Sequence, residues 1–181
     1  MKRPDQIITY TGVRFAPLNP HAEGIRIADI AHSLSLLCRA NGHFKQFFSV
    51  AQHSLNCAEE AGRRGLSKKM QLACLLHDAS EAYISDVTRP VKRDLPAYAA
   101  IEKRLQECIW DAFRISLTPE ETAQMGAVDD AMLYAEFEEL MGERIFLEMP
   151  EIKSAPDLSE RDFRSVESEY KARCEALMAD C

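Results

Sequence analysis

The residues best suited to chemistry stand in "LLHDASEAY", residues 75–83, where His77, Asp78 and Glu81 follow an apolar run. If a helix continues through this stretch, Glu81 lies one turn beyond the His-Asp pair and shares its face. Imidazole and carboxylate groups bind divalent cations, and burying them without a partner is costly. The stretch therefore predicts a metal ion at the polar end of a buried helix.

A His-Asp pair alone is a weak signal, because a single histidine on an apolar helix is usually a hydrogen-bonded core residue. Further ligand types stand far away in the sequence: His53 on one expected helix, and Asp129 or Asp130 on another, in "VDDAML". Imidazoles and carboxylates from three helices of a bundle can hold one cation. The combination favours a metal site.

The elements that position these residues are predicted to be helices, because apolar residues recur every three or four positions from residue 27 onwards. "TRPVKRDLP", residues 88–96, is predicted to be a loop because two prolines bracket it. The β-branched and aromatic residues of the first 27 positions favour a hairpin or an extended arm. Helices are predicted over 27–41, 50–61, 68–78 with Ser67 as cap, 97–115, 119–141 with a break near Gly126, and after Ser159 as cap. The sum is an all-α domain of about six helices with a short extended or hairpin N-terminal element.

Composition limits the classes of function. A net charge of −7 and a pI of about 5.3 argue against a general nucleic-acid or membrane-surface binder. The N-terminus lacks an apolar signal segment and no apolar run has the length of a membrane span, so we expect a cytoplasmic protein.

Cysteine usage gives a second limit. The six cysteines form no C-x-x-C pair, and we expect them to be buried thiols in a reducing cell, with Cys181 exposed and incidental. A zinc site or a disulfide framework is the alternative.

The chain resembles the HD-domain phosphohydrolases, in which a histidine, a His-Asp pair and a distant aspartate on separate helices bind a divalent metal. "FSVAQHSLNCA" resembles the family's first-histidine helix, and "LLHDASEAYISDVTRPVK" resembles the bacterial 5′-deoxynucleotidases. "DIAHSLSLLCRANGH" is similar to the opening helix of a subgroup that includes phage dATP triphosphohydrolases. The resemblance covers most of residues 7–141 and none of the last forty. It implies one HD-type domain over 1–181, with an arm (1–27), a core (28–149) and a C-terminal helix (150–181).

The resemblance implies roles for individual residues. The metal ligands would be His53, His77, Asp78 and Asp129, with Asp130 as the alternative to Asp129. Glu81 would orient or deprotonate the attacking water, and Asp86 would lie near that water or the leaving oxygen. The identity of the metal stays open between manganese, cobalt, iron, zinc, nickel and magnesium.

Cationic residues are needed to bind an anionic substrate at a carboxylate-lined site. The expected loop supplies Arg89 and Lys92, and Lys92 also falls at a family position. Arg39 and His43 of "CRANGH" are further candidates for phosphate binding. Arg14 on the N-terminal arm is another candidate, although the arm could instead pack on the bundle.

These observations predict a metal-dependent phosphohydrolase acting on deoxynucleotides, either a monophosphate 5′-nucleotidase or a triphosphohydrolase of the dATP type. The alternative is a non-catalytic, metal-containing nucleotide sensor on the same fold, which would not need Glu81. The expected partner is a small nucleotide rather than a nucleic-acid polymer or a membrane. Family habit suggests a homo-oligomer, either a dimer or a hexamer.

Overall fold

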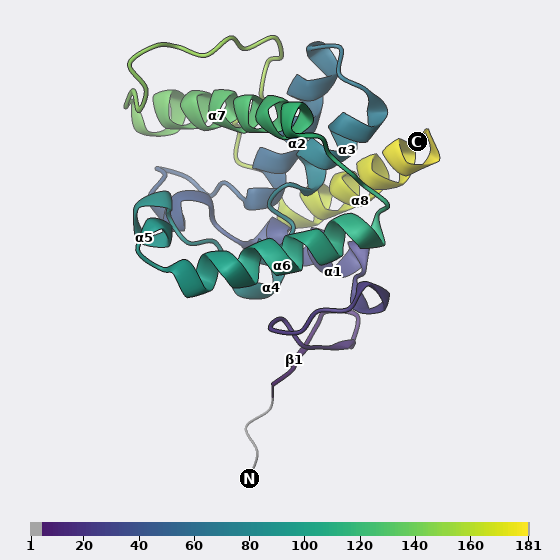
Figure 1. Cartoon of the computed structure of the whole chain (residues 1–181). Helices are drawn as coiled ribbons and strands as arrows, with labels where there is room; N and C mark the ends of the chain where they lie inside the picture. Colours follow the sequence, from purple (N-terminus) through teal and green to yellow (C-terminus); the bar gives the residue numbers. More distant parts are fainter. Residues whose placement is uncertain (1–4, 181) are drawn as a thin grey trace.

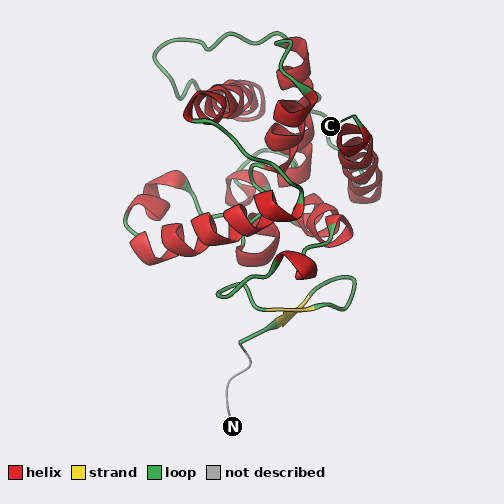
Figure 2. Cartoon of the chain, turned by 45° about the vertical axis from the view of Figure 1, so that its right-hand side comes forward, coloured by secondary structure: helices red, strands yellow, loops and turns green. Residues whose placement is uncertain are grey.

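The computed structural model describes residues 5–180, and almost all of its regular structure is α-helical (Figure 2), which confirms the all-α prediction. Six helices have nine or more residues, while α4 and α5 are single turns. The helices are α1 (Ile27–Leu36), α2 (Val50–Arg63), α3 (Lys68–Leu76), α4 (Glu81–Ile84), α5 (Arg89–Arg93), α6 (Pro96–Ala112), α7 (Pro119–Met141) and α8 (Phe163–Ala179). Two 3-10 turns, η1 (Ala22–Gly24) and η2 (Arg39–Gly42), flank α1.

Helix α3 packs against α2, α7 and α8, and α2 packs against α1, α3, α7 and α8 (Figure 1). Ser67 caps α3 as predicted, and its last three residues, Cys74 to Leu76, are all buried. Burying each leucine-sized side chain stabilises the fold by about 1.5–3 kcal/mol. This packing fixes the position of the C-terminal end of α3, and His77 is the next residue.

The N-terminal hairpin is confirmed. Strands β1 (Ile7–Ile8) and β2 (Arg14–Phe15) pair antiparallel. Successive side chains alternate across a strand, so Phe15 packs inward on Tyr83, with ring centroids 4.4 Å apart, while Arg14 points outward. The hairpin lies at the end of the molecule opposite α7 (Figures 1 and 2).

Two predicted interruptions of helix were wrong. Helix α7 runs unbroken through Gly126, because packing of Val128 and Ala131 offsets the roughly 1 kcal/mol that glycine costs in a helix. Residues Arg89–Arg93 form α5 instead of a loop, with Pro90 in the first turn, where its missing N–H leaves no hydrogen bond unmade.

The segment between α7 and α8 binds along a polar stripe of α2. Four residues spaced one turn apart make the contacts. Gln52 donates to the carbonyl of Ser159, and Asn56 pairs with the backbone of Asp157. Glu60 accepts from the amides of Lys153 and Ser154, and Arg64, which follows α2, donates to the carbonyl of Glu151. Because this segment stays extended, α8 starts at Phe163 with Asp162 as its cap, and the prediction of Ser159 as cap was wrong.

Burial divides the cysteines. Cys57, Cys74 and Cys174 are buried free thiols as expected, but Cys108 is only partly buried. Cys38 is exposed because α1, predicted to reach residue 41, ends at Leu36. Cys181 lies outside the described residues. Within residues 5–180, every helix is too short or too polar to span a membrane.

Candidate metal centre

Two histidines from different helices meet at the centre of the bundle. His53 lies within α2 and is fully buried, and His77 directly follows α3. Their Nε2 atoms are 3.2 Å apart. The burial of both helices holds the two rings in this position.

The other ring nitrogens fix how these rings are protonated. Nδ1 of His77 lies 2.8 Å from the carbonyl oxygen of Cys74, which can only accept, so Nδ1 donates. Nδ1 of His53 lies 2.6 Å from Oε1 of Glu136 and donates to that carboxylate. In the neutral rings both Nε2 atoms therefore carry lone pairs that face each other. Such a pair of acceptors needs a proton or a cation between them.

Two carboxylates complete the cluster. Oδ1 of Asp129 lies 3.2 Å from Nε2 of His53 and 3.7 Å from Nε2 of His77. Oδ2 of Asp78 lies 3.2 Å from Nε2 of His77 and 3.8 Å from Nε2 of His53. Ligand atoms at about 2.0–2.2 Å from one first-row cation are separated by about 3.0–3.5 Å. The two imidazoles and two carboxylates thus fit a shared divalent cation.

Charge in the cation-free cluster is balanced by protons. Burial acts to lower the pKa of His77, but the Asp78 carboxylate and then Asp129 outweigh it and raise that pKa well above its ordinary value. Burial acts to raise the pKa of Asp129, but hydrogen bonds from His53 and His77 hold it well below its usual range. A cation would take the place of these protons.

A thiol belongs to the same cluster. Cys57 stands four residues after His53 on α2, and its Sγ lies 3.4 Å from Nε2 of His53. Donor atoms of His53, Cys57 and His77 all lie within 4.8 Å of one another, a grouping that could hold a metal ion. Burial raises the pKa of Cys57 well above its ordinary value, so the cation-free thiol keeps its proton.

Glu136 and Arg39 contact the residues of the cluster from outside it. The Arg39 guanidinium, whose side chain is 11% exposed, lies 3.3 Å from Asp78 Oδ2 and 3.4 Å from Glu136 Oε2. Glu136 was not predicted as a site residue. Its position seven residues after Asp129, two turns along the same face of α7, is the signal that could have identified it.

Glu81 is buried beside this cluster with an unused oxygen. Glu81 is the first residue of α4 and is 4% exposed. Its Oε2 has no hydrogen-bond partner among the described residues. Burial, followed by repulsion from Asp78 and Asp86, raises the pKa of Glu81 well above its ordinary value. A proton acceptor or donor is thus available next to the cluster.

A cavity of about 450 Å³ opens from the cluster between α5, α7 and the segment after α7. Its polar part includes Asp78, Glu81 and Asp129, and its cations are Arg39, Arg89 and Lys92. Its apolar wall comes from Ala40, Phe44, Val87, Pro90, Leu133, Phe137, Ile145 and Phe146. None of these wall residues was predicted as a site residue, because they come from separate segments of the chain.

Three other predicted residues, Asp86, Arg89 and Lys92, line the cavity. Lys92 also pairs with Glu102 at 2.6 Å. Arg89 holds Asp129 at 2.7 Å and Asp130 at 2.9 Å.

Three predicted residues do not line the cavity. Asp130 points to Arg89, so the structure brings Asp129 and not Asp130 to the histidines. His43 follows η2 outside the cavity lining. Arg14 is on the outer face of the hairpin, away from the cluster.

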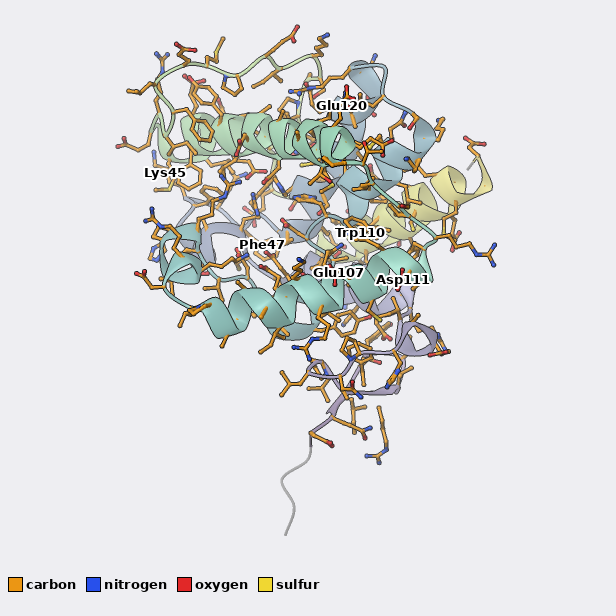
Figure 3. All side chains as sticks on the ribbon, viewed as in Figure 1. Lys45, Phe47, Glu107, Trp110, Asp111 and Glu120 are labelled. Carbon is orange, nitrogen blue, oxygen red and sulfur yellow. The ribbon has the colours of Figure 1, made fainter. Side chains whose placement is uncertain are left out.

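A second cavity, of about 540 Å³, is lined by His77 and Asp78. It lies between the start of α7 and α6, and Figure 3 labels two of its residues, Glu107 and Trp110, on α6. Asp78 and Lys92 line both cavities.

Comparison with known proteins gives a family but no activity. No family model matches the chain. An uncharacterized protein of Rhodobacter capsulatus is 36% identical over 104 residues, which cover 55% of this chain and 53% of that protein. The uncharacterized protein YfdR of Escherichia coli strain K12 is 34% identical over 134 residues, which cover 74% of this chain and 71% of YfdR. The chain belongs to the same family as YfdR.

Proposed function

We propose that the protein is a metal-dependent phosphohydrolase of the HD-domain type that hydrolyses a phosphate ester or anhydride of a deoxynucleotide. The observation that carries the proposal is the meeting of the His53 and His77 lone pairs with two carboxylates beside a cavity lined by cations. The resemblance of the His53 and His77–Asp78 segments to HD phosphohydrolases supports the same assignment.

His53, His77, Asp78 and Asp129 would hold the cation. It would supply Lewis acidity to a phosphoryl oxygen and make water nucleophilic near neutral pH. Glu136 orients His53 through Nδ1, and the Cys74 carbonyl orients His77 in the same way. These contacts direct both Nε2 atoms into the cluster, as outer partners of metal-binding histidines do.

Glu81 is the proposed proton carrier. Its unpaired Oε2 and its pKa, which burial raises well above the ordinary value, suit a group that gains and loses a proton during the reaction. As a carboxylate it would accept a proton from the attacking water, and as an acid it would return one to the leaving oxygen. Asp86 lines the same cavity and raises the proton affinity of Glu81.

The cavity suits a phosphorylated molecule with an aromatic part. Lys92, Arg89 and Arg39 would neutralise phosphate oxygens, since phosphoryl transfer depends on positioning and charge stabilisation more than on covalent help. Phe137, Phe146 and the other wall residues would contact a nucleobase. The volume of about 450 Å³ falls within the roughly 300–1,000 Å³ of small-molecule sites. Arg14 and His43 have no part in this proposal.

Product analysis tests the proposal and separates its two forms. Purified protein is freed of metal, loaded with manganese or cobalt, and incubated with a panel of deoxynucleoside mono- and triphosphates. Phosphate and a nucleoside from monophosphates indicate a 5′-nucleotidase, and tripolyphosphate from triphosphates indicates a triphosphohydrolase. If no nucleotide is hydrolysed with any metal, the proposal is wrong.

A non-catalytic nucleotide sensor with a bound metal is the second candidate. The fit of the four donor residues to a cation supports a sensor as well as it supports an enzyme. The unpaired, buried Oε2 of Glu81 favours the enzyme, because a binding site gains nothing from an unsatisfied carboxyl that costs stability. Nucleotide binding without turnover by the metal-loaded protein would favour the sensor.

A further inference from the structure

We propose that Cys57 is a ligand of the same metal centre and gives it a preference for thiophilic cations. This inference rests on the metal centre of the proposed function and adds a donor that the HD pattern of two histidines and two aspartates does not contain. Its basis is the convergence of donor atoms from His53, Cys57 and His77 within 4.8 Å.

The position of Cys57 follows from helix geometry. Residues four apart on a helix lie on one face, one above the other, so Cys57 follows His53 directly along α2. Its Sγ is 3.4 Å from Nε2, the metal-facing nitrogen, and 4.0 Å from Nδ1. A thiolate sulfur at about 2.3 Å and an imidazole nitrogen at about 2.0 Å from one ion are about 3.0–3.5 Å apart, depending on the angle between the two bonds. The separation of 3.4 Å fits a shared ion.

Burial makes the thiol a fixed donor. Cys57 is 1% exposed, and α2 is packed against both α3 and α7. Among the polar contacts of the described residues, Cys57 Sγ meets only the ring of His53. Binding a cation forms a metal–sulfur bond, breaks the S–H bond, and releases the proton to solvent.

The chemistry of the donors sets the preference. Carboxylates from Asp78 and Asp129 alone would suit magnesium and manganese, while a thiolate favours zinc, cobalt and cadmium. Adding a sulfur donor to two imidazoles therefore raises the affinity of the site for thiophilic ions relative to magnesium and manganese. Cys74 offers a matched comparison: it is also buried at 1% exposure and lies on the neighbouring helix, but its thiol is outside the donor group.

Cobalt(II) reports sulfur ligation without any assay of activity. Metal-free protein is titrated with cobalt(II), and the near-ultraviolet thiolate-to-cobalt charge-transfer band is recorded for wild type, Cys57→Ser, Cys74→Ser and Cys38→Ser. The inference predicts the band in wild type and in the two control variants, and its loss in Cys57→Ser. Helical circular dichroism verifies that each variant is folded.

Metal competition gives the second readout. Cys57→Ser should lose about 10–100-fold in affinity for zinc while its affinity for manganese changes little, since even outer-sphere partners of a metal contribute about that much. If Cys57→Ser does not fold, cobalt-edge X-ray absorption of Cys38→Ser, which removes an exposed thiol, detects whether sulfur remains among the ligands.

The outcomes separate the two proposals. Cobalt that binds without the band, or a band that persists in Cys57→Ser, overturns the role of Cys57 and leaves the proposed function intact. Failure of the wild type to bind any divalent cation overturns both.

Discussion

Glu136 accepts a hydrogen bond from Nδ1 of His53 across 2.6 Å, and both side chains are fully buried. This contact determines that Nε2 of His53 presents its lone pair to the cluster. Glu136→Gln keeps an oxygen that can accept from Nδ1 but removes the negative charge that, against the effect of burial, raises the pKa of His53 and makes Nε2 a stronger donor to a cation. We expect metal affinity to fall about 10–100-fold, measured by isothermal titration with manganese or cobalt. Glu138→Gln, two residues along α7 and partly exposed, is the control and should bind metal like wild type.

Glu81→Gln separates proton transfer from metal binding. The substitution keeps the shape of the side chain but removes its ability to take a proton. The kcat should fall about 10²–10⁴-fold, the usual contribution of general acid–base catalysis. The metal stoichiometry should stay that of wild type. Full activity in this variant would exclude the proposed role of Glu81.

The apolar wall of the cavity should determine how well the base is bound. Phe146 lines the cavity and stacks on Tyr134, whereas its neighbour Leu147 is fully exposed. Phe146→Ala should raise KM about tenfold with little change in kcat, because it removes apolar contact area of the size that contributes about 1.5–3 kcal/mol. Leu147→Ala should leave both constants unchanged. Equal effects of the two substitutions in steady-state kinetics would argue against a base subsite here.

The segment after α7 is held by a carboxylate whose effect should depend on pH. Burial acts to raise the pKa of Glu60, but hydrogen bonds from Arg64, Ser154 and Lys153 lower it below its ordinary value. Its contribution to stability is therefore full above the unfolded-state pKa of about 4 and is lost as pH falls through the folded-state value.

Glu60→Gln should lower the free energy of unfolding by about 1–3 kcal/mol at pH 7, because buried donors lose their acceptor. The difference from wild type should shrink below about pH 4. Denaturant titrations at several pH values measure it, with Glu59→Gln, a surface neighbour paired with Arg63, as the control. A difference that grows on acidification would contradict this account.

The sequence predicted the helices whose apolar residues repeat with helical period, and the four candidate donor residues that it indicated lie close together in the structure. His53 and Asp129 are positioned by α2 and α7, whereas the helix predicted to carry His77 and Asp78 ends at Leu76. Those two residues therefore lie in the turn that follows α3. Local signals misled where tertiary packing decides: Gly126 does not interrupt α7, and Asp162 rather than Ser159 caps α8.

The residues of the cavity wall could not be predicted from the sequence. Phe44 follows a turn in which Ala40 and Asn41 take positive φ, and Phe146 lies beyond the end of α7. No periodic pattern links such residues, because their meeting depends on the path of two irregular segments. Glu136, unlike these wall residues, could have been predicted, since its spacing from Asp129 places both residues on one face of α7.

The neighbouring aspartates on α7 provide the most direct test of the metal-dependent activity. Oδ1 of Asp129 lies 3.2 Å from Nε2 of His53, while Asp130 pairs only with Arg89 among the described residues. Metal-free wild type, Asp129→Asn and Asp130→Asn are titrated with manganese while nucleotide hydrolysis is followed. We expect activity to rise to a plateau at one equivalent in wild type and Asp130→Asn, and to be absent in Asp129→Asn. Hydrolysis that needs no added metal, or that survives in Asp129→Asn, would contradict the proposed centre.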